Sequence, residues 1–508
     1  MTKSLICLTL TCQTLKENAE LCERYAKYAD IAELRVDFLT EDEQLEVRKF
    51  PSMIRMPCIL SIRRTEDGGK FNSSEFSRTA LFARALAFAD RNPSKNYAYV
   101  DFEEDFHIPG LEDAALAFGV KIIRSLYHLE GPLTNIRERC LSMRKTGYEI
   151  PKIVQTPHNL SDVTNLFKEA EKFNDFDHIL GATGILGIPS RILSSKLNSC
   201  ITYTTPKETA GNLISSGLLD PVTLNEIYNF KSINEKTDIF AVTGNPLRTP
   251  NSILLQNAGF RSHGMNKVFI PLNSTSIAES LQFAENVGIQ GLSIEYPFNR
   301  EILYNIEELD TEAAEINSAN TIIRKNTRWV CYQTTVYGFQ QAFTQFLGFP
   351  KLHKRKVAII GAGAAAAAIA YTIRLMGGKA CIFNRNQIQA KMLADRFGFV
   401  SAPLGIEGLN TLEKYSDIII QATSVGMNNH DEPSKENNPI WFYQFKGHEM
   451  VFDIIYTPEQ TALMKVALNA GCQVSNGIQM LKYQNYRQFK HFTGEDYESS
   501  NLINKSYR

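Results

Sequence analysis

The stretch VAIIGAGAAAAAIA at residues 357–370, followed by KACIFNRN at 379–386, decides the fold of the C-terminal half. It reads as a buried strand, a tight turn at Gly361-Ala362-Gly363, a helix and a second strand. Small residues in such a turn, with Ala364 next, let backbone N–H groups approach a pyrophosphate at the helix N-terminus. The pattern predicts a doubly wound dinucleotide-binding domain.

The end of the second strand predicts which dinucleotide is bound. NAD sites usually carry Asp or Glu there, because a carboxylate binds the ribose 2′-hydroxyl. Here the position holds Asn384 with Arg385 beside it. A guanidinium favours a 2′-phosphate, so we expect NADP as the cofactor.

Length and composition limit the classes of protein to consider. The chain has 508 residues, enough for about three domains, and it carries 54 Lys and Arg against 55 Asp and Glu. No basic block stands out, so neither nucleic acid nor a membrane is an expected partner. The nine cysteines lack metal-ligand spacing, and no 18-residue apolar span or signal peptide is recognisable. We expect a soluble, cytoplasmic enzyme of small molecules that binds no metal.

Residues 1 to about 235 follow a different pattern. Eight short apolar runs alternate with helix-like stretches, and they begin near residues 5, 31, 58, 97, 121, 152, 178 and 200. This alternation predicts a (β/α)8 barrel, in which chemistry gathers at the C-terminal ends of the strands. The polar residues at those ends are Glu33, Arg35, Arg63, Asp101, Glu103, Ser125, Lys152 and, after the seventh strand, Arg191.

Lys152 is the residue of this group with the most specific chemistry. A lysine that is desolvated in a barrel mouth near other cations has a lowered pKa, and it can attack a ketone to form a Schiff base. The arginines could hold a carboxylate. The alternative is an ordinary lysine at a strand edge.

Several motifs resemble known families. ELRVD at 33–37, RxxxDGG at 63–69, IPK at 150–152 and PSRIL at 189–193 resemble type I 3-dehydroquinate dehydratase. GNPL at 244–247, ANT at 319–321, ATSVGM at 422–427, DIIYTPEQT at 453–461 and NGIQMLKYQ at 476–484 resemble shikimate dehydrogenase. Their order is that of the fused enzyme of plants and some bacteria. The resemblance implies a barrel over 1–235, a substrate-binding domain over 236–345 completed by 476–508, and an NADP-binding Rossmann domain over 346–475.

The dehydratase resemblance implies roles for single residues. Lys152 would form the Schiff base with 3-dehydroquinate, in a site that also contains Glu33, Arg35, Arg63, Arg191 and, in the lid, Asn212. The family's Ser-x-His reads Ser125-Leu126-Tyr127, with His128 one place later. We expect His128 to be the catalytic base, with Asp67 as its carboxylate partner, provided that the strand end bulges or has become loop. Otherwise His128 is a rim residue without a role.

The dehydrogenase resemblance includes two losses. The family's catalytic lysine and aspartate read Asn299 and Thr335, and neither residue type titrates near neutrality. Glu295 is either a substitute acid or base, or a solvated charge at a strand end. Of two serines that hold the substrate carboxylate, one reads Pro250 and the other is Ser252. The positions that match the family are, for 3-dehydroshikimate, Ser252, Asn320, Tyr456 and Gln484, and, for the cofactor, Thr423.

Two functions follow from these patterns. The first is a bifunctional enzyme of aromatic biosynthesis, which dehydrates 3-dehydroquinate and reduces 3-dehydroshikimate with NADPH. The alternative is a weak dehydratase fused to a dehydrogenase-like module that binds NADP without catalysis.

Overall fold

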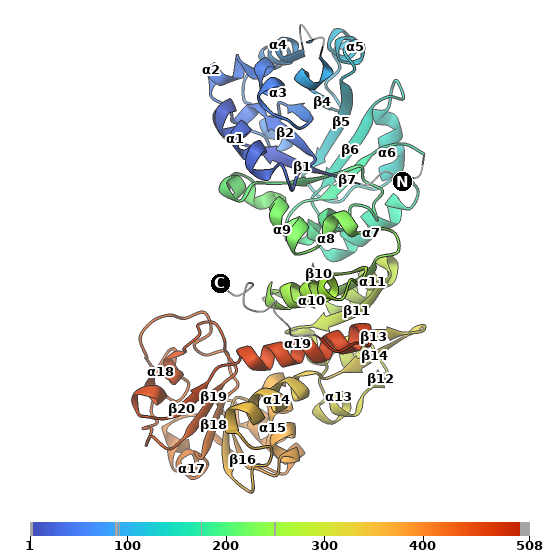
Figure 1. Cartoon of the computed structure of the whole chain (residues 1–508). Coiled ribbons are helices and arrows are strands. Elements are labelled where there is room, and N and C mark those ends of the chain that lie inside the picture. The colour runs from blue at the N-terminus through green and yellow to red at the C-terminus, as the bar shows by residue number, and fades with distance from the viewer. Residues whose placement is uncertain (1–3, 87–89, 91, 174, 248–249, 498–508) are drawn as a thin grey trace. The chain divides into compact units, whose positions relative to one another are not determined.

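The computed structural model describes residues 4–86, 90, 92–173, 175–247 and 250–497, without the side chains of 212, 214–216 and 250 (Figure 1). Contacts divide the chain into two compact units, Met1–Gln290 and Gly291–Arg508. No helix in the described ranges has the length and the apolar character needed to cross a membrane.

The first unit begins with eight parallel strands in the order β7-β6-β5-β4-β3-β2-β1-β8. An isolated bridge between His178 and Ser199 brings β7 and β8 together. The strands are β1 (Leu5–Leu10), β2 (Ile31–Arg35), β3 (Cys58–Ser61), β4 (Tyr99–Glu103), β5 (Lys121–His128), β6 (Ile150–Gln155), β7 (Ile179–Ala182) and β8 (Ile201–Thr204). The predicted (β/α)8 barrel is confirmed, because each predicted apolar run overlaps or adjoins one of these strands.

Helices separate these strands along the chain. They are α1 (Leu15–Tyr25), α2 (Glu41–Gln44), α3 (Phe50–Met53), α4 (Glu75–Leu86), α5 (Pro109–Ala117), α6 (Ile136–Met143), α7 (Leu160–Ala170), α8 (Ile188–Ile192) and α9 (Pro221–Glu226). The longer ones bury one face, as in α7, whose N-terminus is closed by a capping box between Asn159 and Asp162.

The interior of the barrel is packed in layers, because alternate residues of each strand point inward. The lower layers are mainly apolar. One contains Cys7, Ile59, Ile123 and Ile179 from the odd-numbered strands, and another contains Ile31, Tyr99, Ile150 and Ile201 from the even-numbered strands. Two residues further along the even-numbered strands come Glu33, Asp101, Lys152 and Tyr203, each at most 5% exposed. We call these four side chains the polar layer. It holds charges where barrels usually carry branched apolar side chains.

The first unit continues past the barrel. β9 (Asp238–Gly244) and β10 (Lys267–Asn273) pair in parallel, with α10 (Pro250–Ser262) and α11 (Ile277–Val287). Phe283 of α11 contacts Phe167 of α7 edge to face, with ring centroids 5.5 Å apart. The domain limits at 235 and 345 rest on motifs and stay predictions.

The second unit combines a small mixed sheet with a doubly wound parallel sheet. In the first sheet β13 (Thr321–Lys325) lies between β11 (Ile289–Ile294) and β14 (Arg328–Tyr332), and β12 (Glu308–Leu309) pairs with β14. The second sheet is parallel, in the order β17-β16-β15-β18-β19-β20. Its strands are β15 (Lys356–Ile360), β16 (Lys379–Asn384), β17 (Val400–Pro403), β18 (Ile418–Gln421), β19 (Met450–Asp453) and β20 (Gln473–Ser475). The strand order reverses between β15 and β18, where such sheets bind ligands.

The helices of the second unit cover these sheets. They are α12 (Phe298–Glu301), α13 (Thr311–Ile316), α14 (Thr335–Leu347), α15 (Ala364–Leu375), α16 (Gln387–Phe397), α17 (Leu409–Lys414), α18 (Ala462–Asn469) and α19 (Ile478–Thr493). The alanine run of α15 is almost fully buried from Ala366 to Ala370. Small side chains let this helix lie close to the sheet, so its N-terminus is held at the end of β15.

Candidate active sites

Lys152 lies at the centre of the polar layer. Its Nζ donates to Asp101 Oδ2 at 2.8 Å, and Glu33 Oε1 lies 3.6 Å away. The same nitrogen lies 4.1 Å from the ring centroid of Tyr203. Lys152 is therefore not an ordinary lysine at a strand edge, because it is 1% exposed and is contacted by groups from three other strands. The sequence reading did not single out Tyr203, although it stands two residues after Ile201 as Lys152 does after Ile150.

The charged groups nearest to Lys152 are not the cations that the sequence predicted. Burial by itself lowers the pKa of this amine, but Asp101, with Tyr127, Tyr203 and Glu33, outweighs burial and holds its pKa well above the ordinary value. The predicted lowered pKa is wrong, because carboxylates rather than arginines are the nearest charges. The resting group is an ammonium, which must lose a proton before it can attack a carbonyl carbon.

The arginines of this site are not equivalent. Arg35 forms a bidentate pair with Asp37 at 2.9 and 2.7 Å. Arg63 donates to the hydroxyl of Tyr127, and its guanidinium lies 3.8 Å from the centroid of that ring. Arg191 Nε is buried and has no hydrogen-bond partner within the described ranges. Arg191 therefore has the N–H group that is free for an anionic ligand.

A cavity of about 340 Å³ opens onto Lys152. Thr9 Oγ1 and Tyr203 Oη, both from residues of its lining, are also buried without a partner among the described atoms. The residues predicted from the sequence that line it are Glu33, Arg35, Arg63, Asp67, Lys152 and Arg191. The volume suits a small ligand. The unpaired buried N–H and O–H groups of the lining residues suit a ligand with several oxygen atoms. The side chain of Asn212 lies outside what the structure describes, and its backbone belongs to a 3-10 segment at Lys207–Ser216.

His128 is placed differently from the expectation. β5 pairs with β6 in unbroken register to its last residue, with Tyr127 opposite Val154 and His128 opposite Gln155. Because no bulge occurs, Tyr127 and Val154 line the cavity, and His128 is not among the described lining residues. The Nδ1 atom of His128 lies 2.8 Å from the Gly131 carbonyl oxygen instead. Burial raises the pKa of Tyr127, although Arg63 and Lys152 oppose this effect, so its side chain is a neutral phenol at pH 7.

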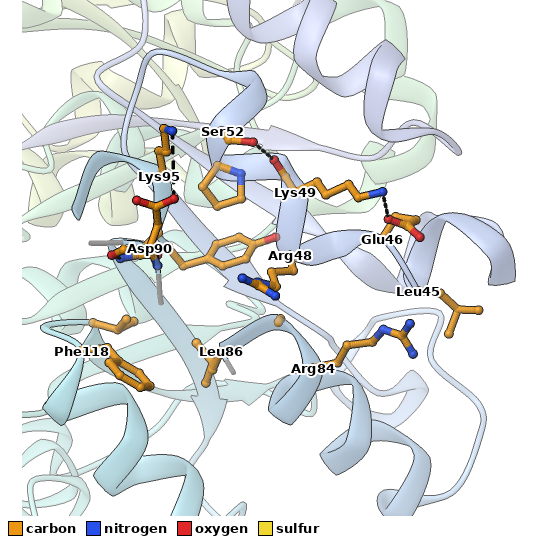
Figure 2. A pocket seen from close by; sticks show the side chains of 15 residues that line it. Leu45, Glu46, Arg48, Lys49, Ser52, Arg84, Leu86, Asp90, Lys95 and Phe118 are labelled. Atoms are coloured by element: carbon orange, nitrogen blue, oxygen red, sulfur yellow. Dashed lines mark hydrogen bonds and ion pairs between the residues drawn. The ribbon is translucent and has the colours of Figure 1, made fainter. Parts of the chain in front are cut away.

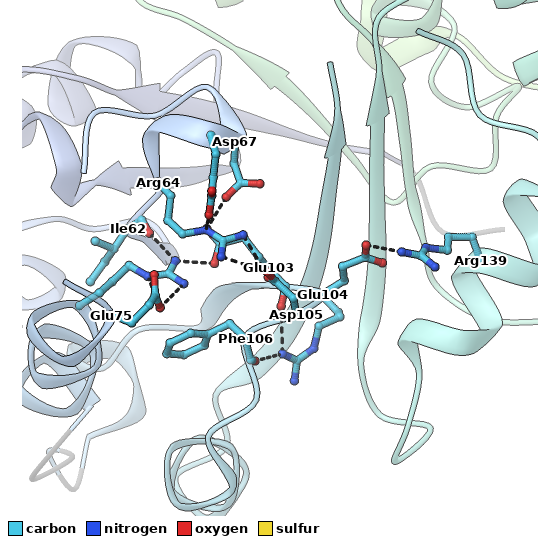
Figure 3. Close-up of polar contacts among 12 residues, drawn as sticks. Ile62, Arg64, Asp67, Glu75, Glu103, Glu104, Asp105, Phe106 and Arg139 are labelled. Atoms are coloured by element: carbon cyan, nitrogen blue, oxygen red, sulfur yellow. Dashed lines mark hydrogen bonds and ion pairs between the residues drawn. The ribbon is translucent and has the colours of Figure 1, made fainter. Parts of the chain in front are cut away.

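Asp67 belongs to the loop after β3, which is held in place by hydrogen-bonded ion pairs. Figure 3 shows Arg64 between Asp67 and Asp105: its Nε donates to Asp67 at 2.7 Å, and two further N–H groups donate to Asp105 at 3.0 Å. The expected pairing of Asp67 with a histidine is therefore replaced by a pairing with Arg64. A Cβ on Gly69 would lie 2.2 Å from the Arg63 carbonyl oxygen, so the turn requires glycine. These contacts fix the loop that carries Arg63.

A larger groove, of about 690 Å³, lies near the N-terminal ends of the barrel strands (Figure 2). Its cations are exposed, and two of them have acidic partners: Lys49 pairs with Glu46, and Lys95 lies 4.0 Å from Asp90. None of the predicted site residues lines this groove. The cavity at Lys152 is therefore the candidate site of the barrel.

The dinucleotide turn of the second unit has the expected shape. Gly361 has φ +115°, and a Cβ there would lie 2.9 Å from the Ala422 carbonyl oxygen and 3.0 Å from Thr423 Cγ2. A Cβ on Gly363 would meet nothing within 4 Å, and α15 starts after it without a side-chain cap. The first N–H groups of α15, beginning at Ala364, therefore adjoin open space in which a phosphate fits.

The residues expected to select the dinucleotide lie beside this turn. Asn384 ends β16, which pairs with β15, and Arg385 follows it as an exposed residue. Asn384 Nδ2 donates to the Asn386 carbonyl oxygen at 3.1 Å. Thr423 Oγ1 donates to Gln421 Oε1 and accepts from Val425 N–H, so its hydroxyl shapes the turn after β18. These residues fit a dinucleotide with a 2′-phosphate.

Three residues of the predicted dehydrogenase site form one network. Asn320 Nδ2 donates to Thr335 Oγ1 at 3.0 Å, and Thr335 Oγ1 donates to Gln484 Oε1 at 3.3 Å. Asn299 instead donates from Nδ2 to the carbonyl oxygens of Ile294 and Ala319, at 2.7 and 3.2 Å. The network contains no group that titrates near neutrality. Tyr456 is half-buried in the same unit, and Ser252 is buried in the first unit.

Comparisons with known proteins show which families the parts of the chain are similar to. Residues 6–235 match type I 3-dehydroquinase, 242–322 the shikimate dehydrogenase substrate binding domain, and 345–438 shikimate / quinate 5-dehydrogenase. The chain is 26% identical to the bifunctional 3-dehydroquinate dehydratase/shikimate dehydrogenase, chloroplastic, of Arabidopsis thaliana, over 97% of this chain and 82% of that protein. It is 31% identical to the shikimate dehydrogenase (NADP(+)) of Pyrococcus furiosus, over 52% of this chain and 93% of that protein.

A solved structure, dehydroquinate dehydratase and shikimate dehydrogenase from S. pombe AroM, aligns with 98% of this chain and 97% of its own, at 19% identity and a TM-score of 0.43. The sequence matches cover the barrel and the dehydrogenase-like domains in the order that the motifs predicted. The chain therefore belongs to the family of bifunctional type I 3-dehydroquinate dehydratase/shikimate dehydrogenase proteins.

Proposed function

We propose that the barrel dehydrates 3-dehydroquinate to 3-dehydroshikimate through an iminium on Lys152, and that the second unit reduces 3-dehydroshikimate to shikimate with NADPH. The observation that carries the proposal is the buried Lys152 amine beside a cavity that is also lined by Arg191, whose Nε has no partner among the described atoms. An amine can condense with the ketone of the substrate while the guanidinium holds its carboxylate.

An iminium makes the C–H bond beside it acidic, so elimination requires a group that accepts this proton and one that donates a proton to the departing hydroxyl. Tyr127, with its hydroxyl held by Arg63, and Glu33, 3.6 Å from Lys152 Nζ, are titratable groups of the cavity lining. We assign both proton transfers to this pair rather than to His128.

In the second unit, Gly361, Gly363 and Ala364 would hold the pyrophosphate of NADP, and Asn384 and Arg385 its 2′-phosphate, with Thr423 nearby. The cofactor, when bound, supplies the hydride. Asn320, Tyr456 and Gln484 would bind the hydroxyl groups of the substrate. The alkoxide that forms needs a proton, and neither Asn299 nor Thr335 supplies one, so we expect the reduction to be slow.

A second candidate function for this unit is NADP binding without catalysis. The hydrogen bonds of Asn299 favour it, because they bind this side chain to two backbone carbonyl groups at the position of the family's catalytic lysine. A cytoplasmic location also stays a proposal, since the Arabidopsis relative is named as chloroplastic.

Separate steady-state assays of the two half-reactions on the purified chain test these proposals. Dehydration is followed by the ultraviolet absorbance of the conjugated product, and reduction by the loss of NADPH absorbance. The bifunctional proposal requires both signals. Dehydration together with NADP binding, but without any NADPH oxidation, would select the second candidate.

A further inference from the structure

The ammonium of Lys152 has one close proton acceptor in the described part of the chain. Asp101 Oδ2 lies 2.8 Å from Nζ, whereas Glu33 Oε1 lies 3.6 Å away and is shared with Arg63 Nη2 at 3.5 Å. The side chains of Lys152 and Asp101 are 1% and 3% exposed. Among the described groups, Asp101 is therefore the nearest acceptor for a proton that leaves Lys152.

Iminium formation moves two protons. The ammonium and the ketone together give an iminium and one water molecule, whose oxygen comes from the carbonyl and whose two hydrogens both come from the lysine nitrogen. The amine nitrogen and the carbonyl oxygen are the two ends of this transfer. A group that takes protons from nitrogen and gives them to oxygen is needed, because both atoms react inside a buried site.

We propose that Asp101, which contacts the reacting amine but is not itself among the described residues that line the cavity, carries these protons between Lys152 and the carbonyl oxygen. It is thus a catalytic residue of iminium formation. This inference rests on the proposed dehydratase function. Asp101 first takes a proton from the ammonium. The amine lone pair then forms the C–N bond while the carbonyl π electrons move to oxygen, which takes the proton from Asp101.

The second proton follows the same route. It leaves the nitrogen of the adduct for Asp101 and passes to the hydroxyl, the C–O bond breaks, and water departs with its electron pair. The nitrogen lone pair forms the C=N bond. Asp101 ends as the carboxylate that it was at the start, so atoms and charge balance without another reactant.

The neighbouring groups support this assignment. Tyr203 presents its ring to Nζ rather than its hydroxyl, and Tyr127 uses its hydroxyl to accept from Arg63. The Ser125 side chain hydrogen-bonds with Asp101, and Ser125 lies opposite Lys152 in the β5–β6 register. Adjacent strands therefore orient the carboxylate towards the amine.

The test measures adduct formation rather than turnover. The full chain is mixed with 3-dehydroquinate or, separately, with propionaldehyde, and is quenched at intervals with sodium borohydride. Mass spectrometry quantifies the reduced adduct on the peptide that contains Lys152. Asp101→Asn should slow formation of the adduct at least about 10²-fold with both carbonyl compounds. Asp101→Glu should restore part of the rate, because it returns the carboxylate.

Glu103→Gln is the matched control. It removes a buried carboxylate from the same strand, where Glu103 pairs with Arg78 rather than with Lys152, and it should change the rate only a few-fold. If Asp101→Asn does not fold, as judged by circular dichroism, Asp101→Glu is compared with Asp101→Gln of equal size, with the same expectation.

The outcomes distinguish the role of Asp101 from the proposal that 3-dehydroquinate is the substrate. Adduct formation by Asp101→Asn at the wild-type rate would overturn the inference, and so would a wild-type chain that reacts with neither compound. Reaction with propionaldehyde alone would show that 3-dehydroquinate is not the substrate, while the aldehyde rates would still decide the role of Asp101.

Discussion

Replacing Asp453 by asparagine should make the second unit more stable at high pH relative to the wild type. Asp453 ends β19 and is fully buried. Its Oδ1 accepts from Ile455 N–H at 2.9 Å, and its Oδ2 accepts from the Thr461 hydroxyl at 2.7 Å. Burial raises the pKa of this carboxyl from 3.8 to about 7, and the two hydrogen bonds oppose this only in part.

The direction of the pH effect follows from the protonation of Asp453 in the folded and the unfolded chain. Well below pH 3.8 the carboxyl is protonated in both states, so its contribution to stability is fully present. As the pH rises towards 7 the unfolded chain ionises and the folded chain does not, so this contribution is lost. A pKa raised by about 3 corresponds to roughly 4 kcal/mol in total. Of this, about 2 to 3 kcal/mol is lost between pH 5 and pH 8.

Tryptophan fluorescence measures this effect selectively. The chain has two tryptophans, Trp329 and Trp441, and both belong to the second unit. Urea titrations of the wild type and Asp453→Asn at pH 5 and pH 8 give the difference in the free energy of unfolding at each pH, and other titrating groups cancel in that difference. From pH 5 to pH 8, the difference in the free energy of unfolding should shift in favour of the variant by about 2 to 3 kcal/mol. A difference that is the same at both pH values would refute the reasoning.

Three further predictions concern the two sites. Tyr127→Phe should reduce the dehydration rate about 10²-fold or more, and His128→Ala much less, because only Tyr127 lines the cavity; initial rates in the reverse order would return the base to His128. Arg385→Ala should remove the preference for NADP over NAD in calorimetric titrations, and a wild type that binds both equally would contradict the assignment. Asn299→Lys combined with Thr335→Asp should raise shikimate oxidation by at least about 10²-fold, and an unchanged rate would show that other losses limit this site.

The fold was predictable because its signals are local. Each barrel strand is a short apolar run, and the dinucleotide turn is recognisable from adjacent small residues, although glycine is required at 361 by its positive φ and by the approach of Ala422 and Thr423. The even-numbered strands also carry a period of two, which places Lys152 two residues beyond Ile150. That period predicts which side chains point into the barrel, although not which of them meet across it.

The chemistry of the barrel site was less predictable because it depends on contacts between strands. The sign of the Lys152 pKa shift is set by Asp101 of β4, whose distance from the amine no local pattern gives. The position of His128 depends on whether β5 bulges at its end, and its sequence is compatible with both forms. The network of Asn320, Thr335 and Gln484 likewise joins segments that are far apart in the chain.

The central claim is that Lys152 forms a covalent iminium with 3-dehydroquinate. Steady-state mixtures of the chain and this ketone, reduced with sodium borohydride and digested, should contain the Lys152 peptide with the mass of the reduced ligand attached. Lys152→Met should lack that adduct and the dehydration activity together. A wild-type chain that dehydrates 3-dehydroquinate while this peptide stays unmodified would contradict the account.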